Sequence, residues 1–285
     1  MRLLTIKTLL LWVIISGAQT NAQSFLNMAS YQVGLGSSSM LGDLGGADGK
    51  GTNFIKDFDY KSIRGSGSLS LDWIGAEHFE YRTNLSYIYL NANDQFSGDK
   101  NRRLRNLSVN SSIIEFAPTI KYNFTSNKKI IIQKLSGKKN IRFYLTLGTG
   151  FIYFNPKAEY NGKNYSLKKL STEGQGLSNG AKEYSKISLV IPYGIGASKD
   201  INEKMAMFFE LTNRKCFTDY LDDVSTVYYD NASLAANYGQ ESAALADRTI
   251  GDKHVNGGKR GNSGKKDSYF TLSFGFKKTF IKKDK

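Results

Sequence analysis

Apolar and polar residues alternate through the last long hydrophobic segment of the chain, Tyr269–Phe280. Successive side chains of a strand point to opposite faces, so this segment predicts a strand with one apolar face and one polar face. It ends in an aromatic residue close to the last residue of the sequence, which is typical of the closing strand of an outer-membrane β-barrel. We expect the apolar face to meet lipid, and it carries Phe270, Leu272, Phe274 and Phe276.

Eight segments alternate in this way, and an even number of strands can close an antiparallel sheet. The pattern predicts an all-β fold, a closed antiparallel eight-stranded transmembrane β-barrel with long extracellular loops. Pro118 and Pro192 fall inside two of the segments, where each removes a backbone donor, so we expect a bulge or a strand end at each. The segments are Asn27–Ser39, Tyr60–Ile74, Phe79–Leu90, Ser112–Phe124, Ile141–Phe154, Ser185–Lys199, Lys204–Arg214 and Tyr269–Phe280.

The connections between these segments alternate in length. Two are short, Gly75–His78 and Asp200–Glu203, and Thr125–Asn140 is of middle length. In bacterial barrels the periplasmic turns are short and the external loops long. The alternation therefore predicts a bacterial outer-membrane location with both termini in the periplasm, whereas a soluble β-sandwich, the alternative, needs no such alternation. The long connections are Gly42–Asp59, Asn91–Ser111, Asn155–Tyr184 and Phe217–Asp267.

The first residues of the chain have the features of a secretory signal peptide. Arg2 and Lys7 precede a short apolar core, Leu9–Ile15, and small residues follow it. A core of this length is too short to span a bilayer as a helix. We expect residues 1–22 to be a cleaved signal and residues 23–285 to form one outer-membrane barrel domain, with an uncleaved anchor as the alternative.

Composition narrows the class of membrane protein and of partner. Mean hydropathy is −0.39, and after the signal no long apolar stretch occurs, which argues against membrane-spanning helices. The formal net charge of +14 raises the question of nucleic acid, but the lysines cluster in the connections and at the tail. In a secreted, strand-rich chain such lysines favour contact with lipid head groups or an acidic protein, so we expect outer-membrane lipid and no nucleic acid.

The polar face of the predicted strands holds charged residues of both signs. An eight-stranded barrel is just wide enough to be filled by side chains. Charges in such an interior should pair, because an unpaired buried charge is costly. We predict a plugged interior without an open pore, in which pairing is structural and not catalytic. The predicted network is Arg64, Asp72, Glu80, Arg82, Glu115, Lys121, Arg142, Lys186, Glu210 and Arg214.

Candidate chemistry is sparse. His78 and His254 lie in separate connections, and neither has metal-ligand spacing. The acidic residues around Asp222 and Asp223 could hold a cation, but their spacing differs from the calcium-loop pattern, which favours an acidic surface loop. An outer-membrane acyltransferase or protease would need a nucleophile or carboxylate group at the rim, and none is found. We expect no enzyme activity, no metal, no cofactor and no small-molecule substrate.

Four blocks of the sequence together resemble a family of Bacteroidetes outer-membrane barrels that includes PorG, a type IX secretion system component. The resemblance implies a non-enzymatic anchoring or assembly subunit that meets the periplasmic ring proteins of that system. It also implies that Asp43, Tyr220, Asp222 and Asp223 serve in loop packing or partner contact. A small OmpA-like structural or adhesive surface barrel is the alternative. The blocks are Gly34–Gly46, Phe154–Gly176, Ile191–Gly196 and Phe217–Asp230.

Overall fold

The computed structural model describes residues 29–44, 60–137 and 140–280. The predicted signal, residues 1–22, lies outside the described residues, as do residues 23–28 and the tail after Phe280. Residues 45–59, which belong to the first long connection, and residues 138–139, which belong to the connection of middle length, also lie outside them.

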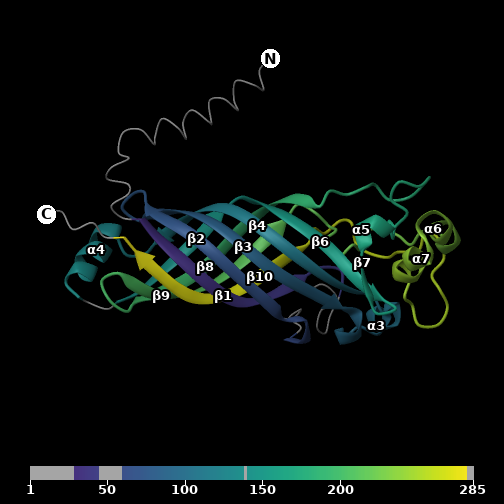
Figure 1. The fold of residues 1–285 in the computed structure, drawn as a ribbon, viewed down its shortest axis with the longest axis horizontal. Coiled ribbons are helices and arrows are strands. Elements are labelled where there is room, and N and C mark those ends of the chain that lie inside the picture. The colour runs from purple at the N-terminus through teal and green to yellow at the C-terminus, as the bar shows by residue number, and fades with distance from the viewer. Residues whose placement is uncertain (1–28, 45–59, 138–139, 281–285) are drawn as a thin grey trace, which may run out of the picture.

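The strands form one antiparallel sheet whose two ends meet. The hydrogen-bonded order is β3-β2-β1-β10-β9-β8-β5-β4-β6-β7, and β3 also pairs with β4. Because β5 and β6 follow one another along β4, they fill one position in a ring of eight strand positions, from which β7 extends as a hairpin partner of β6 (Figure 1). The strands are β1 Ala29–Leu41, β2 Arg64–Ile74, β3 Phe79–Asn93, β4 Ser108–Asn123, β5 Ile141–Gly148, β6 Gly150–Tyr160, β7 Lys163–Ser166, β8 Ile187–Asp200, β9 Met205–Cys216 and β10 Ser268–Thr279.

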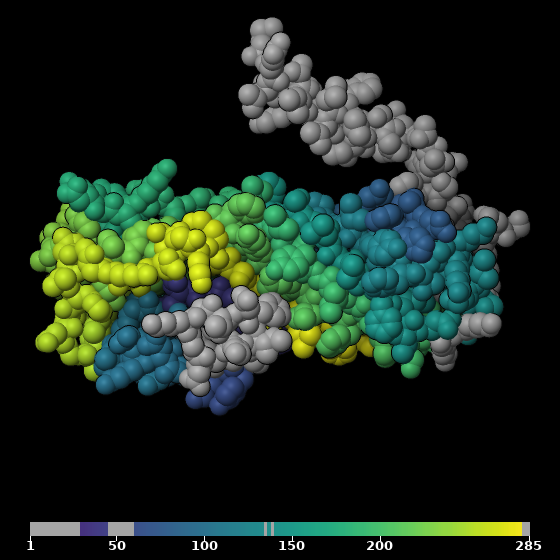
Figure 2. Space-filling view, turned by 180° about the vertical axis from the view of Figure 1, so that it is seen from behind, coloured from purple at the N-terminus to yellow at the C-terminus, as the bar shows by residue number. Residues whose placement is uncertain are grey.

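Short helices lie at the two ends of the ring. The end of the ring where β1 begins and β10 ends also carries α4 (Asn127–Leu135), and the opposite end carries the long connections (Figure 1). The segment between β9 and β10, coloured yellow-green, covers that opposite end (Figure 2). None of the described helices is long and apolar enough to cross a membrane. The helices of the long connections are η2 Tyr60–Ser62, η3 Asp94–Phe96, α3 Lys100–Arg105, α5 Leu167–Leu170, α6 Asn231–Tyr238 and α7 Gln240–Ala246.

The apolar residues of the alternating segments lie on the outside of the ring and form a continuous exposed band. Leu35 and Phe274, which pair between β1 and β10, are 66% and 60% exposed. Rings gather where this band meets the short turns, as in the contacts of Tyr31 with Phe280 and of Trp73 with Tyr81. Other exposed members are Val33, Leu69, Leu71, Leu85, Ile114, Phe116, Ile120, Phe143, Leu145, Leu147, Phe151, Leu189, Ile195, Met207, Phe209, Leu272 and Phe276.

Phe270 corrects one detail of the predicted lipid face. It stands on the same face of β10 as Leu272 and Phe274, yet only 8% of it is exposed. Its cross-strand neighbours, Ser39 and Asn213, are polar residues that are likewise buried. The exposed apolar band therefore ends at Leu272 on this strand, one outward position short of the prediction.

Neither proline produces the bulge or the strand end that the sequence predicted at its own position. β4 and β8 continue through Pro118 and Pro192, and the strand between them is interrupted instead, at Thr149. Pro118 faces Thr149 and accepts its N–H at 3.2 Å, while the unbroken register of β5 and β6 against β8 sets Pro192 opposite Gly148. A proline donates no hydrogen bond, so each removes a ladder bond from this intervening strand, and no residue is inserted.

The interior of the ring is divided along its length. At the end with the long connections the inward residues are apolar, and Ile88, Ile113 and Phe154 are fully buried. They pack in one cluster with Leu221 and Leu245 from the segment between β9 and β10. Toward the short turns the inward residues are charged. The connections are thus fastened to the ring by a hydrophobic core, which the alternation of the strands alone did not predict.

Candidate functional site

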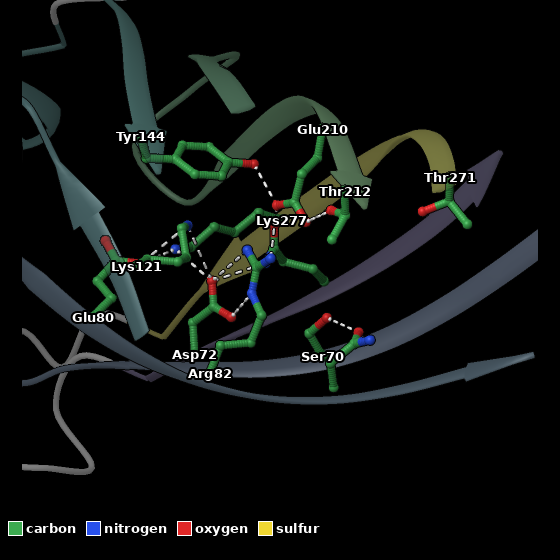
Figure 3. Close-up of polar contacts among 12 residues, drawn as sticks. Ser70, Asp72, Glu80, Arg82, Lys121, Tyr144, Glu210, Thr212, Thr271 and Lys277 are labelled. Atoms are coloured by element: carbon green, nitrogen blue, oxygen red, sulfur yellow. Dashed lines mark hydrogen bonds and ion pairs between the residues drawn. The ribbon is translucent and has the colours of Figure 1, made fainter. Parts of the chain in front are cut away.

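A six-residue group of charges crosses the interior of the ring, and we call it the central ion cluster. Asp72 of β2 and Arg82 of β3 are direct cross-strand partners, and Arg82 Nε lies 2.9 Å from Asp72 Oδ1. Lys277 of β10, which is separated from β2 by β1 alone, approaches the same carboxylate, with Nζ 3.1 Å from Oδ2. Figure 3 shows these side chains converging on Asp72. The cluster is Asp72, Glu80, Arg82, Lys121, Glu210 and Lys277.

The rest of the cluster balances its charge. Glu80 Oε2 accepts from Lys277 Nζ at 2.9 Å and lies 3.3 Å from Lys121 Nζ. Glu210 Oε2 lies 2.7 Å from Arg82 Nη1 and accepts from the Tyr144 hydroxyl at 2.9 Å. Three carboxylates therefore meet three cations. Such saturation is what a buried set of charges requires if it is to be stable.

Two further ion pairs lie inside the ring, on either side of the central ion cluster along the length of the ring. Arg214 Nε lies 3.1 Å from Glu115 Oε2, and the Tyr269 hydroxyl donates to the same oxygen at 2.7 Å. Near the short turns, Arg142 binds Asp200 through both of its terminal nitrogens. Two cavities between these groups measure about 20 Å³ each, room for roughly one water molecule. A third, between the central ion cluster and Arg142, measures about 60 Å³.

Eight of the ten residues of the predicted interior network lie in these groups. Arg64 does not, because it lies near the long connections and donates to the carbonyls of Lys61 and Ile63. Lys186 precedes β8, and its Nζ donates to Asn155 Oδ1 at 2.6 Å on the outer wall.

The predicted network lacks two of the partners that the structure brings to these groups. Lys277 stands on the polar face of the predicted last strand, so the alternation could have identified it. The sequence pattern places Asp200 in a turn, but β8 runs one residue further than predicted and includes it.

A second group of carboxylates lies among the long connections, and we call it the loop cluster. Glu173 is 1% exposed, and its two oxygens accept from the N–H groups of Ser225 and Thr226, with Arg260 Nη1 at 2.9 Å. Asp222 accepts three backbone N–H groups, of Asp43, Leu44 and Val224. The cluster consists of Asp43, Glu173, Asp219, Asp222, Asp223, Asp267, Arg105 and Arg260.

The four residues that the family resemblance emphasised all lie in or beside this loop cluster. Asp43 holds the N–H of Asn262, and its carbonyl accepts from Arg105 Nη2 at 2.8 Å. Asp223 accepts from the Tyr184 hydroxyl at 2.6 Å. Tyr220 stacks on Tyr184 with ring centroids 4.3 Å apart. In the structure these side chains pack loops against one another.

Burial changes the acidity of this cluster. It raises the pKa of Asp223 to about 6, against the opposing effect of the Arg260 guanidinium. Burial, and then the neighbouring Asp43 carboxylate, raise the pKa of Asp222 well above its usual value. Burial, together with Asp222, raises the pKa of Asp267 in the same way. The loop cluster is therefore an acidic core that has few cations and holds protons more tightly than free carboxylates do.

The described residues assemble no recognisable catalytic or metal-binding group. His78 Nδ1 is 2.7 Å from the carbonyl oxygen of Asn123, and His254 stacks on Tyr228 in a different connection. Among residues 29–44, 60–137 and 140–280, no three His, Cys, Asp or Glu side chains are placed to hold a metal ion. On this geometry, the central ion cluster fills the interior of the ring and the loop cluster holds the long connections together.

Comparison with solved structures returns small outer-membrane proteins at low similarity. Neisserial surface protein A is 7% identical over 88% of this chain and 96% of its own, with a TM-score of 0.40. Ail of Yersinia pestis, solved in complex with a heparin analogue, is 12% identical over 88% and 97%, with a TM-score of 0.35. The N-terminal β-barrel domain of Pseudomonas aeruginosa OprF is 10% identical over 90% and 99%, with a TM-score of 0.34.

These TM-scores are too low to support a functional conclusion. No protein-family model matches the chain, and no curated protein matches it. A functional assignment therefore depends on the chain's own geometry.

Proposed function

We propose that this protein is a sealed, non-enzymatic β-barrel of a bacterial outer membrane. The observation that carries the proposal is the inversion of a soluble protein's pattern, in which apolar side chains lie outside the closed ring and charges lie inside it. Phe143 and Leu147 are about as exposed as Leu35, while Asp72 and Glu115 are almost inaccessible. Only a lipid surround makes this arrangement favourable, because water would otherwise meet a continuous apolar wall.

The proposed orientation follows from the two ends of the ring. The start of β1, the end of β10 and the short turns share one end, and the long connections share the other (Figure 1). Barrels of this class keep short turns in the periplasm and long loops outside. The loop cluster would then face the cell exterior, and α4 would face the periplasm.

The finer role that we propose is that of an anchoring or assembly subunit of a type IX secretion system. Support comes from the family resemblance and from α4, which presents exposed Lys128, Lys129 and Ile132 at the end of the ring that carries the short turns. A surface with lysines around an apolar residue suits an acidic periplasmic partner. The interior groups fit this role too, since a filled ring holds a position in the membrane and does not conduct cargo.

A second candidate role is an OmpA-like structural or adhesive surface barrel with no secretion partner. The loop cluster favours it, because it builds an ordered surface at the proposed outer end. The resemblance blocks that carry Asp43, Tyr220 and Asp223 lie in that cluster, away from α4, and their side chains are occupied by packing. This observation weakens the link between those blocks and a periplasmic partner.

Cysteine labelling of intact cells tests the location and the orientation. Ala236→Cys on α6 and Ser136→Cys after α4 both place a thiol at an exposed position, and the native Cys216 is buried. A membrane-impermeant maleimide should label the first variant in intact cells and the second only after the outer membrane is opened. Equal labelling of both in intact cells, or recovery of the protein in the soluble fraction, would contradict the barrel proposal.

Purification from detergent-solubilised membranes separates the two roles. Recovery of periplasmic ring proteins with the wild-type chain, and their loss from a Lys128→Glu/Lys129→Glu variant, supports the secretion role. A Lys265→Glu/Lys266→Glu variant changes the same number of exposed lysines at the opposite end and should retain them. Recovery of the barrel alone from wild-type membranes would leave the surface-barrel role.

A further inference from the structure

Four lysines gather around Ser166 on the outer wall of the ring. Ser166, the last residue of β7, pairs with Lys157 of β6. Lys168 and Lys169 follow it in α5. Lys186 Nζ donates to Ser166 Oγ at 3.2 Å and to Asn155 Oδ1 at 2.6 Å. We call Lys157, Lys168, Lys169 and Lys186 the lysine cluster.

The charge of the lysine cluster is not compensated within the described part of the chain. There, none of the four lysines forms an ion pair with a carboxylate. The contacts of Lys186 are with neutral oxygens, and Lys168 lies over the Tyr184 ring, with Nζ 5.7 Å from its centroid. Burial and then the charges of Lys168, Lys169 and Lys157 lower the pKa of Lys186. An anion bound among these side chains would relieve their mutual repulsion.

The lysine cluster also has a defined height on the wall. Tyr153 pairs with Ile187 between β6 and β8, and both are exposed members of the apolar band. Asn155 lies two residues beyond Tyr153 on the same face, about 7 Å further along the strand. Lys186 directly precedes Ile187. The cluster therefore stands at the edge of the apolar band, on the side of the long connections.

We propose that the lysine cluster binds the phosphate groups of a phosphorylated glycolipid in the outer leaflet, an inference that rests on the proposed membrane location. Lysine ammonium groups are effective phosphate ligands. At this height the phosphates of a lipid head group would meet the ammonium groups while its acyl chains lie against Phe151 and Leu189. A free anion would gain nothing from the apolar band below, which is why the geometry favours a lipid.

Native mass spectrometry of the full-length protein in a non-ionic detergent tests this inference. The probe is diphosphorylated lipid A, compared with the same lipid after removal of both phosphates and with inorganic phosphate as competitor. Wild-type protein should bind the phosphorylated lipid at least about tenfold more tightly than the dephosphorylated one, because lysines near a membrane surface favour anionic lipid. Inorganic phosphate at millimolar concentration should not displace it.

Matched triple variants separate a site from general charge. Lys157→Gln/Lys168→Gln/Lys169→Gln should lose most of the preference for phosphorylated lipid. Lys100→Gln/Lys259→Gln/Lys265→Gln removes the same charge from positions elsewhere in the loops and should keep it. Equal loss in both variants, no preference in wild type, or displacement by inorganic phosphate would overturn the inference. The membrane location is tested separately by labelling of the Ala236→Cys and Ser136→Cys variants, so a failure here is distinct from a failure of the proposed function.

Discussion

The central ion cluster and the loop cluster are two buried sets of carboxylates that are stabilised in different ways. In the central ion cluster, Asp72, Glu80 and Glu210 are matched by an equal number of cations. In the loop cluster, Arg260 contacts the carboxylates of Glu173 and Asp223, while Arg105 forms its ion pair with Asp94 and meets the cluster at the Asp43 carbonyl. The six carboxylates of the cluster are bound by backbone N–H groups and hydroxyls. Both sets are satisfied, but by different donors.

The backbone explains the difference. Inside a closed ring the N–H groups are committed to the strand ladder, so an inward carboxylate must be met by side chains. In a connection the N–H groups have no ladder partner, and an Asp or Glu can bind several of them at once. A buried carboxylate in the ring is therefore stabilised by charged side chains, whereas one in the loops is stabilised by backbone N–H groups that the path of the chain brings to it.

Removing the central cation should have the largest effect. Arg82→Met leaves Glu210 hydrogen-bonded to Tyr144 and Thr212 but takes away the cation that binds it. We expect a loss of about 3–5 kcal/mol in the free energy of unfolding, the range for breaking a buried ion pair. Urea titration followed by the gel mobility of the folded form measures it. Arg64→Met, which removes an arginine bound mainly to carbonyls, is the control and should lose far less. A loss below about 1 kcal/mol in Arg82→Met would show that the cluster is not needed for stability.

In the loops, Glu173→Gln should have an intermediate and local effect. The amide keeps one acceptor oxygen but loses the other and its charge, so contacts to Ser225, Thr226 or Arg260 are lost. We expect the free energy of opening this region to fall by about 2 kcal/mol, which is the usual cost of losing hydrogen bonds to a charged group. Hydrogen exchange should show the loss in residues 217–230 and not in the strands. Equal loss of protection in β2 and β3 would mean that the two clusters are not independent.

A rise in pH should lower the stability of the loop cluster. A carboxyl whose pKa is raised on folding contributes stability when protonated, and that contribution is lost as pH rises from about 4 through the raised pKa, about 6 for Asp223. Protection of residues 217–230, corrected for intrinsic exchange, should therefore fall from about pH 4 to pH 6 as Asp223 ionises, and on to about pH 8, the pKa to which burial raises Asp222. Each pKa unit corresponds to about 1.4 kcal/mol. Asp222→Asn should flatten this dependence, and an unchanged slope in that variant would exclude Asp222 as a contributor.

The smallest expected effect concerns a neutral partner in the ring. The Thr271 hydroxyl accepts from Arg214 Nη1, which also donates to the carbonyl of Thr212. Thr271→Val removes one hydrogen-bond acceptor and keeps the shape of the side chain, so we expect the free energy of unfolding to fall by about 1 kcal/mol. The urea titration used for Arg82→Met measures it. Thr146→Val, an inward change on β5 at a hydroxyl that has no hydrogen-bond partner among the described residues, is the control. A loss of stability in Thr271→Val as large as that in Arg82→Met would contradict the conclusion that ion pairs stabilise the interior more than neutral hydrogen bonds do.

Much of the ring could be predicted from the sequence because strand alternation is a local property. The eight segments recur as strands, with their ends displaced by a few residues. The central partners Asp72, Arg82 and Glu210 could be named from the face on which they fall. Arg64 and Lys186 could not be separated from them, because near a strand end the side chain reaches whichever oxygen the adjoining loop provides.

The loop cluster was less predictable for a physical reason. Its bonds join residues far apart in the chain, such as Asp43 with Asn262 and Glu173 with Arg260. No periodicity marks such contacts. The Asp222 carboxylate resembles a solvated surface group in the sequence, and only the path of separate connections makes it a buried one.

The balanced charges of the central ion cluster also have an electrical consequence. An ion entering the ring would have to displace a cation from a carboxylate that already has close partners, and Asp72 alone has three cations within 3.5 Å. In a bilayer the protein should therefore conduct no measurable ion current. Many copies of a ring filled in this way could stand in the proposed outer membrane without making it more permeable to ions or small molecules.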